Sequence, residues 1–156
     1  MKGIRNRRHS QQSGLAIVEF IICAPLLLFL MFSTMEFGRA LMQYNTLTKS
    51  VRDSVRHVAG EARFGSTGSI QLTNALITEG QNLVAYGVRG TPDSPDPLLP
   101  NLQPSDVTIT ALNTDDIRVA VAYDYQPVFV VLPGFGVGQD RSMQFTFRAA
   151  STMRAL

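Results

Sequence analysis

The spacing of apolar positions changes twice along this chain of 156 residues. From Leu15 to Met35 the sequence is almost continuously apolar, because 17 of these 21 residues are Ala, Val, Ile, Leu, Met, Phe or Cys. A helix rises 1.5 Å per residue, so the run covers about 30 Å, the thickness of the hydrocarbon core of a bilayer. The pattern predicts a transmembrane helix at residues 15–35.

Beyond this run, apolar side chains recur at alternating steps of four and three residues. The heptad spacing places them in one stripe along a helix and predicts that the helix from Leu15 continues to about Arg63. Residues 36–63 then form an amphipathic helix. Its stripe is predicted to pack on the chain's own C-terminal domain, with a partner helix as the alternative. The stripe consists of Phe37, Leu41, Tyr44, Thr48, Val51, Val55, Val58 and Ala62.

A second helical pattern and a proline-rich segment follow the stripe. Residues 69–87 predict a helix, since Ser69 is a suitable N-cap and the apolar positions have helical spacing, with Gly80 as an unfavourable interior residue. Five prolines then lie between Thr91 and Pro104, which excludes a regular helix or a central strand. Residues 91–105 are therefore predicted to form a loop or an extended spacer.

From residue 106 the apolar positions alternate with period two. Val107–Ala111, Ile117–Tyr125 and Met143–Ala150 each have one apolar face, and a turn-like tetrapeptide, Asn113–Asp116, joins the first two. Three such strands predict a small antiparallel sheet within residues 106–153, whose apolar face must be covered. The amphipathic helix supplies that cover. The predicted fold class is α+β, with the domain spanning residues 36–156.

The net positive charge of the chain comes from its N-terminus. Residues 1–14 carry four basic side chains and no acidic one, whereas the remainder has 10 basic and 12 acidic residues. The pI of about 9.0 thus describes the leader and no general basic surface, which argues against nucleic-acid binding. A basic leader before an apolar helix predicts a cytoplasmic N-terminus. A secretory signal is disfavoured because its apolar core is shorter, about 7–15 residues.

Glu19 lies at the start of the apolar run, where a carboxylate is energetically unfavourable and by default functional. If the chain were cut between Gly14 and Leu15, the new α-amino group would lie about one helical turn from Glu19. The amine could also come from a neighbouring subunit. Either pairing would offset the desolvation of both charges. The alternative is that Glu19 only anchors the helix at the membrane interface.

No pattern for catalysis, metal binding or a cofactor is found. His9 and His57 have no Cys or carboxylate pattern beside them, and the single Cys23 excludes an intrachain disulfide. Residues 134–138 read Gly-x-Gly-x-Gly, but a proline precedes them and a strand pattern follows, which argues against a phosphate-binding loop. This apolar loop either contacts lipid or a partner, or tucks into the core.

Several segments together resemble a known family. Gly14 is followed by four apolar residues, Glu19 and Phe20, after a short basic leader, which resembles the type IV prepilin signal. The sequence Ser13–Phe20, Pro25, the stretch Met35–Leu41 and the ending Arg148–Arg154 are more specifically similar to TadE-like proteins. These are pseudopilins or minor pilins of the tight-adherence (Flp) pilus assembly system.

The resemblance implies a pilin-like fold and a role in assembly. A membrane aspartic prepilin peptidase would cut after Gly14, and the family's glutamate would correspond to Glu19. The mature protein would lie in the bacterial inner membrane with its C-terminal domain in the periplasm. Its partners would be the peptidase, other pilus and pseudopilin subunits, the inner-membrane assembly platform and membrane lipid. The subtype (TadE, TadF or TadG) is open. The alternative function is a membrane-anchored periplasmic binding or sensing domain that keeps its leader.

Overall fold

The computed structural model describes residues 9–63, 69–90, 96–128, 131–132, 141–142 and 144–156. The chain divides into two compact units, Met1–Arg39 and Ala40–Leu156. Helix α1 (His9–Glu61) supplies the described part of the first unit and continues into the second. The boundary between the units therefore falls within one helix.

The first unit contains the apolar part of α1. Among the described residues this is the one helix long and apolar enough to cross a membrane, and no part of its most apolar stretch is buried. Apolar side chains on all sides of this part of α1 are exposed, and such a surface would be unfavourable in water. The finding indicates a single-pass membrane anchor. The helix begins at His9 and not at Leu15 as predicted, so Gly14 lies inside it.

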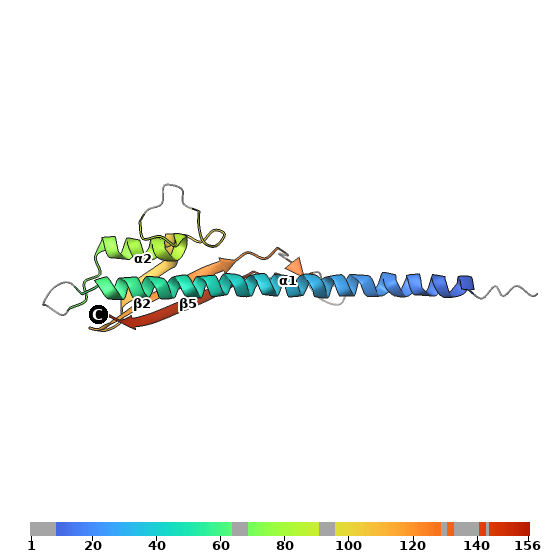
Figure 1. The fold of residues 1–156 in the computed structure, drawn as a ribbon, viewed down its shortest axis with the longest axis horizontal. Helices are drawn as coiled ribbons and strands as arrows, with labels where there is room; N and C mark the ends of the chain where they lie inside the picture. The colour runs from blue at the N-terminus through green and yellow to red at the C-terminus, as the bar shows by residue number, and fades with distance from the viewer. Residues whose placement is uncertain (1–8, 64–68, 91–95, 129–130, 133–140, 143) are drawn as a thin grey trace, which may run out of the picture. The chain divides into compact units, whose positions relative to one another are not determined.

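The second unit contains the rest of α1, a second helix and a sheet (Figure 1). The three-stranded antiparallel sheet has the order β1-β2-β5, and this confirms the predicted α+β fold class and sheet. In its register, Val119 of β2 lies opposite Ile109 of β1 and Ser151 of β5. The elements after α1 are α2 (Asn74–Tyr86), the short 3-10 helix η2 (Pro104–Asp106), β1 (Val107–Ala111), β2 (Asp116–Tyr125), β3 (Val131–Leu132), β4 (Arg141–Ser142) and β5 (Phe145–Arg154).

Strands β3 and β4 form a two-residue antiparallel ladder that the sequence pattern did not predict. Strands this short carry no alternation of polar and apolar residues, so period counting does not detect them. The Gly-rich loop at residues 134–138 lies outside the described residues, as do Met143 at the predicted start of the third strand and residues 91–95 of the proline-rich segment.

Helix α2 is shorter than its pattern suggested. It starts after Thr73, whose Oγ1 accepts a hydrogen bond from the backbone N–H of Leu76 at 3.3 Å. The residues before it are held in extended form, because the N–H of Gln71 donates to the carbonyl oxygen of Ala62 at 2.8 Å. Ser69 therefore does not cap the helix. The helix ends at Gly87, whose φ of 74° is a left-handed conformation that favours glycine.

The core of the second unit lies between α1, α2 and one face of the sheet. Ser54 of α1 donates a hydrogen bond to the carbonyl oxygen of Gly80 in α2 at 2.8 Å, and Ser54 is fully buried. A Cβ at Gly80 would lie 2.6 Å from Ile109 Cδ1 and 2.8 Å from Val58 Cγ2. The interior glycine thus lets α2 approach α1 and β1 closely. The largest fully buried side chains include Leu47, Val51, Val55, Val58, Val84, Leu102, Ile117, Val119, Tyr123 and Tyr125.

Candidate functional site

The predicted cleavage segment lies on an exposed stretch of α1. Leu15 is 72% exposed and Phe20 is 68% exposed, and Gly14 and Glu19 are also exposed. Apart from its chain neighbours and the adjacent helix backbone, a Cβ built at Gly14 would meet no atom of the described residues within 4 Å. The absence of a side chain at Gly14 is therefore not needed for packing in the structure, unlike the absence at Gly80.

Leu15 and Glu19 are four positions apart in a continuous helix. Such positions lie one above the other on the same face, about 6 Å apart along the axis. An amine at Leu15 and the carboxylate of Glu19 would thus be within reach of one another on one helix, once residue 15 became the N-terminus.

The predicted stripe divides into an exposed and a buried part. Val51, Val55 and Val58 are buried in the core of the second unit, whereas Leu41 and Tyr44 are exposed, as is Phe37 in the first unit. Tyr44 and Ala62 are 18 residues apart, which is five full turns of an α-helix, as are Leu41 and the buried Ala59, so the exposed members point to the same side as buried ones. The exposure of Leu41 and Tyr44 therefore reflects less cover at their level of the helix. The buried face instead begins at Leu47, which is not a member of the stripe.

A segment near the N-terminus is similar to a known family. Residues 14–56 match the TadE family model, described as TadE-like protein. The match confirms the resemblance over this segment, which is called the TadE-like segment below. It begins at Gly14 and includes Glu19, Phe20 and the stripe as far as Val55. No curated protein and no solved structure matched the chain.

The TadE-like segment contributes Tyr44 to an aromatic cluster of five rings. Tyr44 lies 5.5 Å from Phe147 on β5, measured between ring centroids, and Tyr125 lies 4.9 Å from Phe145. Phe145 and Phe147 meet edge to face at 5.0 Å. Tyr123 completes the cluster. Its hydroxyl donates a hydrogen bond to Oε1 of Gln43 on α1 at 3.2 Å. These contacts join the TadE-like segment to the sheet at the aromatic end of β2 and β5.

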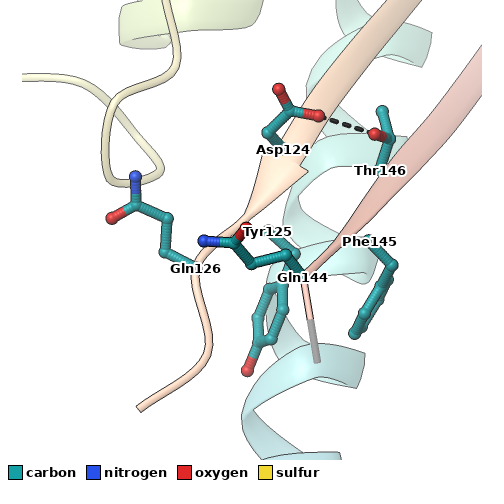
Figure 2. Close-up of a pocket in the computed structure, with 6 residues that line it drawn as sticks. All are labelled: Asp124, Tyr125, Gln126, Gln144, Phe145 and Thr146. Atoms are coloured by element: carbon teal, nitrogen blue, oxygen red, sulfur yellow. Dashed lines mark hydrogen bonds between the residues drawn. The ribbon is translucent and has the colours of Figure 1, made fainter. Parts of the chain in front are cut away.

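An open pocket lies beside this cluster, where β2 ends and β5 begins (Figure 2). Thr146 Oγ1 donates to Asp124 Oδ1 at 2.6 Å across the two strands. The six lining residues include no histidine, cysteine, lysine or arginine. They are Asp124, Tyr125, Gln126, Gln144, Phe145 and Thr146.

A polar cluster lies just beyond the TadE-like segment, at His57. The sequence pattern left this histidine without carboxylate neighbours, and that interpretation is wrong. Nε2 of His57 lies 3.0 Å from Glu79 Oε2 on α2, and Nδ1 lies 3.4 Å from Glu61 Oε1 one turn along α1. The spacing of four residues between His57 and Glu61 is visible in the sequence. The contribution of Glu79 depends on how α2 packs against α1.

Proposed function

We propose that this chain is a TadE-like prepilin that a prepilin peptidase cuts after Gly14. The mature protein acts as a pseudopilin or minor pilin in the assembly of a tight-adherence pilus. The observation that carries the proposal is the family match, which begins at the glycine of the prepilin-type signal and runs through the membrane helix. The partners are the peptidase, other pilus and pseudopilin subunits, and the assembly platform of the inner membrane.

The environment of Gly14 is consistent with a role in recognition. A peptide bond inside a helix is shielded by its neighbouring turns, so a peptidase reaches it only where the helix opens. Glycine lowers the cost of that opening, because it disfavours a helix by about 1 kcal/mol relative to alanine. The exposure of Gly14 and Leu15 leaves the bond between them accessible once the helix opens.

Cleavage would change the electrostatics of the first turns. The leader removed with Met1–Gly14 carries four positive charges, and the new N-terminus at Leu15 carries one. The carboxylate of Glu19 would then lie near a helix N-terminus, where the macrodipole favours an anion, and one turn from an amine. Glu19 pairs either with the amine of its own chain or with that of a neighbouring subunit. Phe20 beside it contributes apolar surface in the bilayer or against another subunit's helix.

The exposed apolar helix supports a membrane location with lateral partners. In a bilayer its side chains contact lipid, or the helices of other pilus subunits and of the assembly platform. We infer that the leader lies in the cytoplasm and the domain from Ala40 onward in the periplasm, because the basic charges lie before the helix.

The decisive experiment replaces Gly14 by alanine in cells that contain an active prepilin peptidase. N-terminal sequencing of the wild-type protein should begin at Leu15, whereas Gly14→Ala should keep residues 1–14 and fail to support pilus formation. Since a Cβ at Gly14 contacts nothing within 4 Å, lost processing would reflect recognition by the peptidase and not misfolding.

Gly38→Ala is the matched control, because Gly38 also lies in α1 and its Cβ would also meet nothing within 4 Å. This variant should be processed like the wild type. A wild-type protein that retains Met1 in the presence of the peptidase would contradict the proposal and favour a membrane-anchored domain that keeps its leader.

A further inference from the structure

The histidine between α1 and α2 is enclosed by two carboxylates. The side chain of His57 is 6% exposed, while those of Glu61 and Glu79 are 54% and 42% exposed. One ligand atom from each of the three residues can be chosen so that all lie within 4.8 Å of one another. The three side chains therefore form one cluster in the second unit, where α1 and α2 run side by side (Figure 1).

In a neutral imidazole, only one of the two ring nitrogens of His57 can donate a hydrogen bond to its carboxylate neighbour. A neutral imidazole has one N–H and one lone pair, yet both nitrogens face carboxylate oxygens, at 3.0 and 3.4 Å. One contact is then an N–H donated to an anion, and the other places a lone pair against an anionic oxygen. The second contact is favourable if a metal ion lies between the lone pair and the carboxylate.

The spacing and the chemistry of the donors fit a transition-metal ion. Zinc binds histidine nitrogen at about 2.0–2.1 Å and carboxylate oxygen at about 2.0–2.2 Å, in tetrahedral geometry. Two such ligands are about 3.3 Å apart, which is close to the 3.0 Å between His57 Nε2 and Glu79 Oε2. An imidazole donor disfavours Mg²⁺ and Ca²⁺, which prefer oxygen ligands. The partial exposure of both glutamates leaves room for water to complete the coordination.

We propose that His57 and Glu79 bind Zn²⁺, that Glu61 orients the imidazole, and that the bound ion holds α2 against α1. Nε2 of His57 binds the ion together with Glu79, and the N–H of Nδ1 donates to Glu61, which fixes the tautomer. Because His57 lies on α1 and Glu79 comes from the other helix, the ion links two elements that Ser54 and Gly80 already bring together. This site is independent of cleavage after Gly14.

The test uses the full chain, purified in detergent and freed of metal with a chelator. Titration with Zn²⁺ should show one ion bound per chain, and saturating Zn²⁺ should raise the thermal unfolding midpoint by about 5 °C. Mg²⁺ and Ca²⁺ at the same concentration should leave the midpoint unchanged. Co²⁺ should give the visible absorption of a tetrahedral site, which reports coordination directly.

Three variants locate the site. His57→Gln and Glu79→Gln should abolish the Zn²⁺-dependent shift, while glutamine preserves a similar shape and hydrogen-bonding capacity for packing. Glu61→Gln should weaken binding without disturbing the fold, since this side chain is mostly exposed.

Two control variants remove potential metal-ligating side chains elsewhere in the chain. His9→Gln and Asp53→Asn should each respond to Zn²⁺ like the wild type. Zinc binding that survives His57→Gln, or a wild type that binds no Zn²⁺, would overturn the proposal.

Discussion

Two parts of the same helix have opposite surroundings. In the part before Arg39, large apolar side chains from Leu15 to Met35 are exposed, and no part of the most apolar stretch is buried. In the part after Ala40, Leu47, Val51, Val55 and Val58 are almost completely buried. Both parts are rich in apolar residues, so the amount of apolar surface does not decide how the helix is used.

The arrangement of polar residues explains the difference. Between Leu15 and Met35 the apolar side chains surround the helix, so no protein face could cover them all, and a lipid environment satisfies them. After Ala40, charged side chains such as Lys49, Arg52 and Arg56 occupy the opposite side from the buried row. That part buries one face against its own domain and leaves the other in water. The helix is continuous, but its solvent changes along its length.

The largest expected effect comes from placing the same charge in each part. Val55→Asp puts a carboxylate into the packed core without a partner, which should destabilise the domain by about 4 kcal/mol or more. Leu28→Asp should cost about 3 kcal/mol of membrane insertion and leave the domain folded. Thermal unfolding followed by circular dichroism tests the first variant, and membrane fractionation tests the second. Equal unfolding midpoints for the two variants would break the comparison.

Removing apolar volume should give an intermediate effect. Leu47→Ala leaves a cavity in the core and should lower the free energy of unfolding by about 3 kcal/mol. Leu27→Ala is the matched control, because Leu27 is an exposed leucine of the same helix. It should leave domain stability within about 0.5 kcal/mol of wild type. Denaturant titration in detergent measures both, and a comparable loss in Leu27→Ala would show that the apolar part packs on the domain.

The smallest effects compare two helix glycines of the second unit. Gly80→Ala forces a Cβ against Ile109 and Val58, and the strain of about 1–3 kcal/mol outweighs a helix-propensity gain of about 1 kcal/mol. We expect a net destabilisation of about 1 kcal/mol. Gly60→Ala meets nothing within 4 Å and should stabilise by up to about 1 kcal/mol. Opposite shifts in the calorimetric midpoint would support the role of close packing at Gly80, and shifts of the same sign would refute it.

The features that sequence periodicity captured are those that repeat over many residues. The apolar run and the three strands each contain enough positions for the period to be unambiguous, and the α+β class follows from them. Features set by a single contact were missed. Helix α2 starts after Thr73, where the Thr73 side chain accepts from the N–H of Leu76 and Gln71 bonds to Ala62, and the β3–β4 ladder is only two residues long on each side.

The same distinction applies to the candidate sites. The prepilin-type segment, Gly14 to Phe20, is contiguous, so its residues could be identified without knowing the fold. The cluster at His57 could not, because Glu79 is 22 residues away and comes close only when α2 packs on α1 through Gly80. The stripe was a mixed case: its period was read from the sequence, but its division into exposed and buried members was not.

By itself, the sequence determined the membrane-spanning length of the first helix, the net positive charge of residues 1–14 and the alternation of the strands, because all three are properties of consecutive residues. Tertiary structure decided which face of α1 is buried, why an interior glycine is required at residue 80, and where His57 finds its two carboxylates. The physical reason is that these outcomes depend on side chains separated along the chain and brought together by packing, whose distances no local pattern records.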